Sequence, residues 1–234
     1  MRSKIFLYTS LLLTILSPGF NSWAQNRENP ELTQTLARMD AVSEKFSSFE
    51  AKFTQKQYVA LLKKFEAPET GEFYYTLDKN RDVQMRHDIL APGVRITTIK
   101  GASATIYQPA AKQAQIYNLG KRKNLVEYMA TGLGQSSAKL KEQFEIGYDG
   151  TEDVNGEQCS ILTLVPKDKN VASSVKSITI WVKKSTGTPA QYKFTEPTNN
   201  YLLETFSGEK LNGKIPADRF EQKLPNGTEI LRLN

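Results

Sequence analysis

One helical segment followed by a long series of short segments with period-two alternation is the feature that most limits the fold of this chain. Apolar residues fall three and four positions apart at Leu32, Leu36, Met39, Val42 and Phe46. This spacing predicts an amphipathic helix from Glu31 to Phe46. The period then changes to two, because Phe49, Ala51 and Phe53 alternate with polar residues. A strand with one apolar face is therefore expected directly after the helix.

The same alternation continues to the C-terminal part of the chain. Further strands are predicted over residues 71–77, 83–87, 94–99, 104–107, 113–119, 144–148, 158–165, 177–183, 190–195 and 201–207. A second helical segment, indicated first by Leu125, Met129 and Leu133 and then by Leu140 and Phe144, divides the series. We expect a mainly β (α+β) protein. Its antiparallel sheet should be an unclosed, strongly curved half-barrel with a helical lid on its concave face.

The N-terminus has the pattern of a secretory signal peptide. Arg2 and Lys4 precede an apolar stretch from Ile5 to Leu16, and Ser22-Trp23-Ala24 supplies small residues at a cleavage position. We expect residues 1–24 to be cleaved and residues 25–234 to form a single domain. A lone cysteine excludes an internal disulfide, and the periplasm is the expected compartment.

The composition argues against catalysis and against most cofactors. One histidine and one cysteine cannot form a histidine cluster for a metal, and any Ser-His-Asp triad would have to use His87. The chain contains no CxxC, HExxH, GxSxG, GxGxxG or GxxxxGK[ST] motif. We therefore predict no catalytic residue, metal or cofactor. His87 is interpreted as a structural histidine and Cys159 as a small buried apolar residue. Trp181 packs under the middle helix or stands exposed for docking.

The charge pattern is mild. The net charge of the whole chain is +6, and its basic residues are spread out with small clusters such as Lys63-Lys64. Such clusters are typical of solvated strand edges, and an anionic membrane or acidic partner is the alternative. Nucleic acid is not an expected partner, and a monomer is expected.

The apolar faces of the helix and strands should point toward one interior. A filled core and a hollow half-barrel with a ligand cavity are both consistent with this pattern. In the second case the helix would close over the cavity and open to admit a ligand. The candidate acyl-binding residues are Leu36, Met39, Phe46, Phe49, Phe53, Phe73, Tyr75, Val83, Met85, Ile106, Ile116, Leu164, Ile178, Ile180, Tyr192 and Phe194.

A family resemblance favours the hollow half-barrel. The segment from Phe46 to Lys56, FSSFEAKFTQK, resembles the start of the outer-membrane lipoprotein carrier family, the LolA proteins. Later features occur in a similar order, including Gly71-Glu72-Phe73, Ile106-Tyr107-Gln108-Pro109, Ile178-Thr179-Ile180 and Pro225-Asn226-Gly227. The resemblance implies an unclosed barrel whose hydrophobic cavity takes the acyl chains of lipoproteins. It also implies a basic residue that pins the lid, for which this chain offers Lys79 or Arg81.

The same resemblance implies a function and partners. A periplasmic carrier would receive acylated lipoproteins from an inner-membrane lipoprotein-releasing ABC transporter and deliver them to an outer-membrane lipoprotein receptor, without making or breaking a bond. The alternative within the fold is a periplasmic sensor that binds lipid or lipoprotein. The alternative from another class is a periplasmic hydrolase, which would require His87 beside both a serine and a carboxylate.

Overall fold

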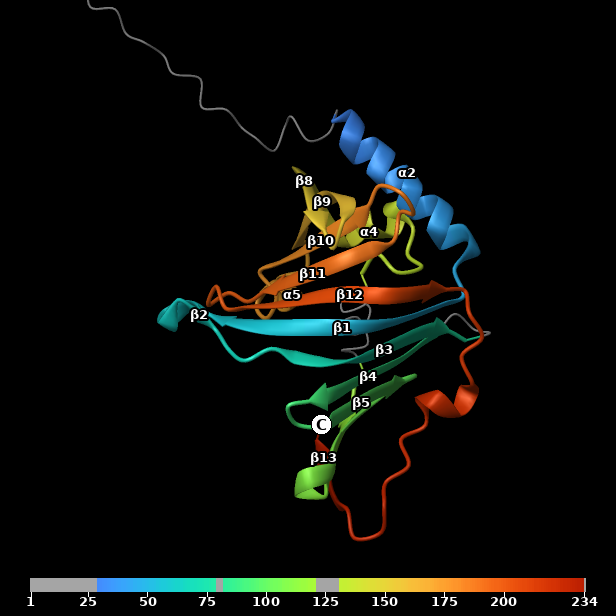
Figure 1. Cartoon of the computed structure of the whole chain (residues 1–234), viewed down its shortest axis with the longest axis vertical. Helices are drawn as coiled ribbons and strands as arrows, with labels where there is room; N and C mark the ends of the chain where they lie inside the picture. The colour runs from blue at the N-terminus through green and yellow to red at the C-terminus, as the bar shows by residue number, and fades with distance from the viewer. Residues whose placement is uncertain (1–28, 79–81, 121–130, 234) are drawn as a thin grey trace, which may run out of the picture.

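The computed structural model describes residues 29–78, 82–120 and 131–233. One mixed, mostly antiparallel sheet of thirteen strands makes up most of the described chain. Its order is β13-β7-β6-β5-β4-β3-β1-β12-β11-β10-β9-β8, with the short β2 paired to β1. Figure 1 shows the sheet as a strongly curved surface with helix α2 crossing one end of it. The predicted mainly β, unclosed architecture is confirmed.

Eleven of the thirteen strands coincide with the predicted alternating segments but are often longer, and β2 and β13 were not predicted. Their bounds are β1 Ser48–Val59, β2 Lys64–Phe65, β3 Glu69–Leu77, β4 Val83–Ala91, β5 Arg95–Lys100, β6 Ser103–Gln108, β7 Gln113–Asn118, β8 Phe144–Val154, β9 Glu157–Pro166, β10 Ser177–Lys183, β11 Pro189–Thr195, β12 Tyr201–Leu211 and β13 Glu229–Leu233. The described helices are α2 Pro30–Lys45, η2 Ala60–Leu62, η3 Pro109–Ala111, α4 Ser137–Gln143, α5 Lys169–Ala172 and η5 Ala217–Phe220. Within the described chain, none of these helices is long and apolar enough to cross a membrane.

The expectation of a purely antiparallel sheet is wrong at one edge. Strand β13 was not predicted, and it pairs parallel to β7, with Leu231 opposite Gln115. All the other strand pairs are antiparallel. Two parallel strands need a long connection, and here residues 119–228 separate β7 from β13 in the sequence.

Helix α2, Pro30–Lys45, begins and ends one residue before the predicted bounds, Glu31 and Phe46. The side chain of Asn29 accepts hydrogen bonds from the backbone N–H groups of Glu31 and Leu32, and Pro30 occupies the first turn, where its missing N–H is not needed. The buried residues Leu32, Leu36 and Met39 form its inner face. The helix is therefore held by its apolar stripe and not by intrinsic propensity alone.

The main core lies between the concave face of the sheet, α2 and the segment that leads into α4. Phe49, Phe73 and Phe206 form its aromatic centre, with ring centroids 5.4–6.2 Å apart. Tyr192 joins this centre and donates a hydrogen bond to the carbonyl oxygen of Thr131 at 2.7 Å. This part of the half-barrel is filled.

The opposite face carries a smaller apolar cluster. Trp181 is buried there with Val154, Cys159 and Ala190, and its indole N–H donates to Glu152 at 2.7 Å. The exposed docking role considered for Trp181 is therefore excluded.

Some predictions fall outside the described residues. They are the signal peptide over residues 1–24, the basic candidates Lys79 and Arg81, and the part of the middle helix that contains Leu125 and Met129. In the described part of the predicted helical segment, α4 begins at Ser137 and ends before Phe144.

Candidate functional site: a pocket at one end of the concave face

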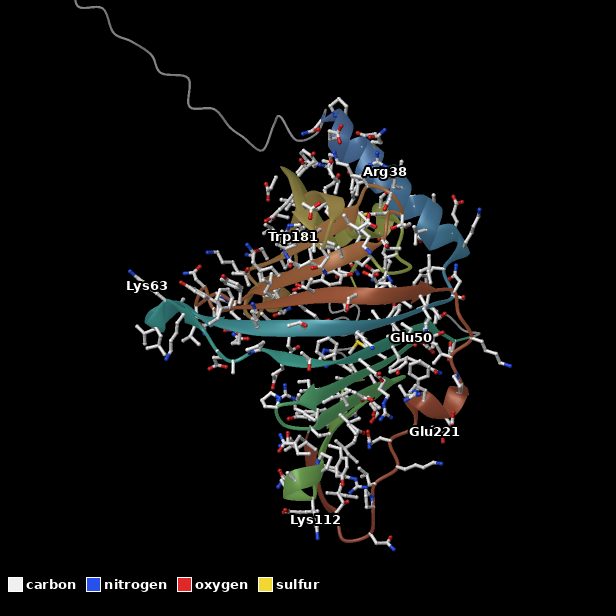
Figure 2. All side chains as sticks on the ribbon, in the orientation of Figure 1. Arg38, Glu50, Lys63, Lys112, Trp181 and Glu221 are labelled. Carbon is white, nitrogen blue, oxygen red and sulfur yellow. The ribbon has the colours of Figure 1, made fainter. Side chains whose placement is uncertain are left out.

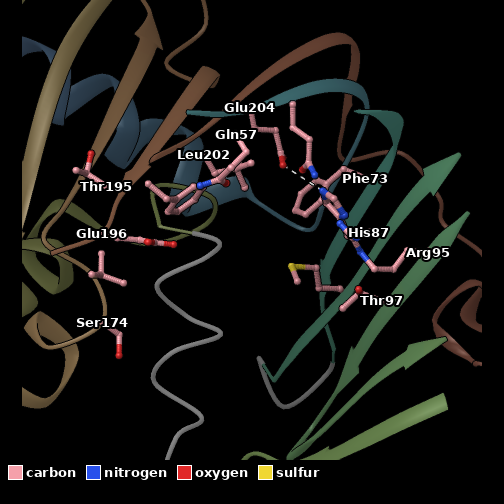
Figure 3. Close-up of a pocket in the computed structure, with 14 residues that line it drawn as sticks. Gln57, Phe73, His87, Arg95, Thr97, Ser174, Thr195, Glu196, Leu202 and Glu204 are labelled. Carbon is pink, nitrogen blue, oxygen red and sulfur yellow. Dashed lines mark hydrogen bonds and ion pairs between the residues drawn. The ribbon is translucent and has the colours of Figure 1, made fainter. Parts of the chain in front are cut away.

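A pocket of about 470 Å³ lies at one end of the concave face. Strands β1, β3, β4, β5, β11 and β12 supply its walls, together with Ser174 and Val175, which follow α5. Figure 3 shows His87, Arg95 and Thr97, on β4 and β5, at one side of the space, and Thr195, Glu196 and Ser174 across it. This volume is within the range of ~300–1,000 Å³ typical of small-molecule sites.

Five side chains form the apolar part of the wall. They are Phe73, Met85, Val175, Phe194 and Leu202. Strand pairing explains why those on the sheet converge, since Phe194 lies directly opposite Leu202, and Phe73 lies directly opposite the pocket residue His87. Side chains that are directly opposite in an antiparallel pair point to the same face. Three members of the sequence-predicted set, Phe73, Met85 and Phe194, therefore lie at this pocket.

The remaining wall is polar, and three of its charged or ionisable side chains, His87, Arg95 and Glu204, each have an ionisable partner. His87 Nε2 lies 3.1 Å from Glu204 Oε2, and both side chains are largely buried. Glu69 accepts hydrogen bonds from Gln55 and, at 3.2 Å, from Arg95. Gln55, His87, Arg95 and Glu204 all line the pocket. An apolar cavity with a polar rim suits a ligand that has both a hydrocarbon part and a hydrogen-bonding part.

His87 has one of the two partners that a hydrolase would need. Among the described residues, Glu204 is the side chain that it hydrogen-bonds, and its ring stacks on Phe53 with centroids 4.1 Å apart. No serine of the described chain completes a triad with it. The described part of the chain also contains no group of three or more His, Cys, Asp or Glu residues placed to hold a metal ion.

Most of the other predicted cavity residues lie in the filled core and do not line this pocket. Their side chains are buried against α2 or against one another; they are Leu36, Met39, Phe46, Phe49, Phe53, Tyr75, Leu164, Ile178, Ile180 and Tyr192. Val83 is partly buried against the same core. Ile106 pairs with the pocket residue Thr97, so it faces the same side of the sheet without lining the pocket.

The predicted direction of Ile116 is wrong. Ile116 pairs with Thr105, whereas Ile106 and its partner Gln115 are on the concave face. Because neighbouring residues of a strand point to opposite faces, Ile116 faces away from the concave side. Tyr117 instead packs against the core. Both faces of β7 carry apolar residues, so periodicity alone does not fix which face is inside.

Sequence reasoning missed the polar half of the pocket. Gln55 and Gln57 continue the alternation of Phe49, Ala51 and Phe53, and β1 runs to Val59. The apolar alternation that predicted this strand stops at Phe53, because the inward residues change from apolar to polar at Gln55. That change is itself the available signal, since glutamines at inward positions of a strand need a polar or open environment.

Helix α2 is closed onto the core by specific polar contacts. The Asp40 carboxylate accepts hydrogen bonds from the backbone N–H and the hydroxyl of Ser137, at 2.6 and 2.7 Å. On the other side, a Cβ added to Gly187 would lie 2.7 Å from the carbonyl oxygen of Arg38, so only glycine permits this approach. None of the described residues that line the pocket belongs to α2.

Cys159 behaves as its sequence context predicts. The side chain is fully buried, and burial raises the pKa of its thiol to about 11. A thiol with such a pKa is almost entirely protonated near neutral pH and is a poor nucleophile.

Comparison with solved structures supports the same architecture. The fold is similar to the crystal structure of MucB, with a TM-score of 0.51 and 12% identity over 86% of this chain and 65% of that chain. It is also similar to an uncharacterized conserved protein from Thermus thermophilus, with a TM-score of 0.54 and 10% identity over 87% of this chain and 99% of that chain. At these identities the likeness shows the fold alone.

Sequence relatives are more specific. The chain is 23% identical to an outer-membrane lipoprotein carrier protein of Pseudomonas entomophila (strain L48), over 95% of this chain and 97% of the relative. It is 23% identical to one of Pseudomonas fluorescens, over 97% of this chain and 99% of the relative. The family model described as outer membrane lipoprotein carrier protein LolA matches residues 44–223, which is most of the chain, and the protein therefore belongs to the LolA family.

Proposed function

We propose that the protein is a periplasmic carrier that binds the acyl chains of lipoproteins and performs no covalent chemistry. The observation that carries this proposal is the pocket of about 470 Å³ with both apolar and polar walls, in a chain that belongs to the LolA family. An acyl chain would lie against Phe73, Met85, Phe194 and Leu202. The more polar linkage to the lipoprotein would face the rim that contains Gln57 and Glu196.

The energetics make such a carrier necessary for acylated cargo. Each CH₂ removed from water contributes ~0.8 kcal/mol, so a lipoprotein with several acyl chains does not leave a membrane unaided. A pocket offers the chains an alternative apolar environment. We propose that an inner-membrane lipoprotein-releasing ABC transporter loads the carrier and that an outer-membrane lipoprotein receptor unloads it.

The filled part of the concave face could become additional cavity if helix α2 moved away from the sheet. Met39 and Phe46 on or beside α2, together with Ile180 and Tyr192 on the sheet, belong to one continuous core that borders the pocket. If α2 moved outward, these side chains would become walls of a larger cavity. We propose that the sequence-predicted residues of the core bind cargo in that open form, and that the closed form is the empty carrier.

The direct test is displacement of a fluorescent hydrophobic probe from the purified protein. A triacylated lipopeptide should displace the probe at a near-equimolar ratio, and the same peptide without acyl chains should not. Failure of the lipopeptide to displace the probe from a folded protein would contradict the proposal.

A pocket variant with a matched control locates the site. Leu202→Gln places an amide in the apolar wall and should weaken lipopeptide binding about tenfold, because burying an unpaired amide costs ~1–3 kcal/mol. Leu211→Gln changes an exposed leucine at the other end of the same strand and should leave binding unchanged. Equal binding by both variants would place the acyl site elsewhere.

A further inference from the structure

Exposed apolar side chains gather at one edge of the sheet. Eight large apolar residues of the described chain are exposed, and five of them lie in or directly beside two neighbouring turns: Leu61, Leu62, Phe65, Leu90 and Val94. The first turn follows β1 and contains η2 and β2, and the second joins β4 to β5. Because β1 and β4 are each antiparallel to β3, they run in the same direction. Their C-terminal ends therefore lie on the same side of the sheet, beside the start of β3. We call the five residues the docking edge.

The first of these turns projects from the sheet and is held in place by specific contacts. Figure 1 shows it extending beyond the rest of the sheet at the end of β1. The backbone N–H of Ala60 donates to the Asn200 side chain at 3.0 Å, which ties the turn to the β11–β12 connection. At its base Tyr58 stacks on Tyr201 at 4.7 Å, and Phe65 meets both rings edge-on. These contacts hold Leu61, which is 90% exposed, away from the protein.

Basic residues accompany the exposed leucines. Lys63 and Lys64 are exposed within the same projection, and Figure 2 shows Lys63 at its far end. Glu66 is the single acid between Ala60 and Glu66, so the tip is positive. This arrangement matches the layers of a membrane surface. The apolar side chains at the tip suit the acyl region, and the lysines beside them and the tyrosines behind them suit the headgroup level. Lysines add attraction to anionic headgroups.

The docking edge also borders the mouth of the pocket. Gln57 and Leu202 line the pocket, and each is adjacent in sequence to one of the stacked tyrosines, Tyr58 and Tyr201. A second cavity of about 420 Å³ shares Gln57, Arg95 and Leu202 with the first. Its other walls include Ala67, just after the projection, and Pro92, in the β4–β5 turn. The pocket therefore opens toward the space between the two exposed turns.

We propose that the docking edge inserts into the surface of an anionic lipid bilayer and presents the pocket mouth to the lipid. The charge of the tip and its exposed leucines identify this partner, because an acidic protein surface would match the lysines but would leave Leu61 and Leu62 without an apolar phase. Docking itself is independent of cargo. Its use, which is to hold the pocket mouth at the membrane surface where the transporter and the receptor exchange acyl chains with the carrier, rests on the proposed function.

The test is flotation of the purified protein with two kinds of vesicle. One kind contains phosphatidylethanolamine and phosphatidylglycerol, and the other contains only phosphatidylcholine. The protein should float with the anionic vesicles and much less with the zwitterionic ones. Leu61→Ser/Leu62→Ser should reduce the partition coefficient by at least about tenfold. Lys63→Gln/Lys64→Gln should reduce it about fivefold for each lysine, and only for the anionic vesicles.

A matched control and a second readout separate the possible outcomes. Leu211→Ser/Leu233→Ser removes two exposed leucines that lie at the opposite ends of the strands from the docking edge, and it should leave flotation unchanged. Leu61→Ser/Leu62→Ser should still bind lipopeptide in the probe assay. A loss of lipopeptide binding in that assay would indicate damage to the pocket and not a loss of membrane docking. If wild-type protein does not float with anionic vesicles, or floats equally well without Leu61 and Leu62, the proposal is overturned. Association that requires a membrane protein in the vesicles would also overturn it.

Discussion

His87 Nε2 lies 3.1 Å from the Glu204 carboxylate, although strands β3 and β1 separate their strands β4 and β12 in the sheet. Three strand spacings of ~4.8 Å would keep these side chains apart on a flat sheet. The contact exists because the sheet curves strongly, and the Phe53 ring fills the space beneath the imidazole at 4.1 Å. This pair joins two walls of the pocket.

Replacing His87 and replacing Glu204 should lower the free energy of unfolding by different amounts. His87→Leu leaves the largely buried Glu204 without its partner and should lower the free energy of unfolding by about 1–3 kcal/mol. Glu204→Gln keeps a hydrogen-bonding side chain beside the ring and should cost less. Urea unfolding of the two variants measures both values. A larger loss for Glu204→Gln would show that the pair does not act as described.

The contact between Asp40 and Ser137 should control how tightly α2 is closed. Asp40→Ala removes both hydrogen bonds from Ser137 and should destabilise α2 by about 1–2 kcal/mol, whereas Ser137→Ala removes only the hydroxyl bond. Amide hydrogen exchange within α2 should be fastest in Asp40→Ala. In the double variant the two effects should not add, because both changes remove the same contact. Unchanged exchange in α2 would show that other contacts hold the helix closed.

Gly71 is the position where a single methyl group should be most damaging. A Cβ there would lie 1.8 Å from the carbonyl oxygen of Asp88 and 2.7 Å from the Phe53 ring. Gly71→Ala should therefore lower the free energy of unfolding by ~1–3 kcal/mol or more, since strand β4 would have to shift. Gly93→Ala is the control, because its Cβ would meet no atom within 4 Å. Thermal melts compare the two variants, and similar melting temperatures would contradict the close approach.

Alkaline pH should destabilise the protein through its buried tyrosines. Burial, and next the hydrogen bond to Glu72, raises the pKa of Tyr74 from 10.0 to about 12, and burial also raises the pKa of Tyr192. Above pH 10.0 the unfolded state loses these protons before the folded state does. The free energy of unfolding therefore falls as pH rises. Denaturant unfolding between these pH values should show this fall.

The control for the alkaline effect is Tyr74→Phe. This variant has no phenol at position 74, so its free energy of unfolding should decrease less steeply over the same pH range. Tyr192 should account for part of the decrease that remains. A slope identical to that of the wild type would assign the alkaline loss to other groups.

The sheet was predictable because most strands bury one face. Alternation at Phe73 and Tyr75, or at Ile178 and Ile180, indicates both the strand and its inward side. Strand β13 lacked this signal, since Ile230 and Leu233 are exposed and its pairing partner β7 is remote in sequence. Ile116 was assigned to the wrong face because apolar residues occur on both faces of β7.

The pocket was only partly predictable. Phe73, Met85 and Phe194 were found because inward apolar residues belong either to a core or to a cavity wall. Whether a residue lines empty space depends on the curvature of the sheet and on how far α2 reaches, and neither is encoded in local periodicity. Glu204 and His87 were not paired in advance because their contact crosses two other strands.

The position of β1 in the middle of the sheet has a consequence for how the chain folds. On one side β1 pairs with β3, which follows it closely, but on the other side Phe53 pairs with Phe206, near the end of the sheet-forming sequence. If the β1–β3 hairpin forms first, one side of β1 therefore stays unpaired until β12 pairs with it. Such nonlocal pairing slows folding, and an unpaired apolar strand favours aggregation. We expect the newly made chain to be most vulnerable during this interval, before the two ends of its sequence have met.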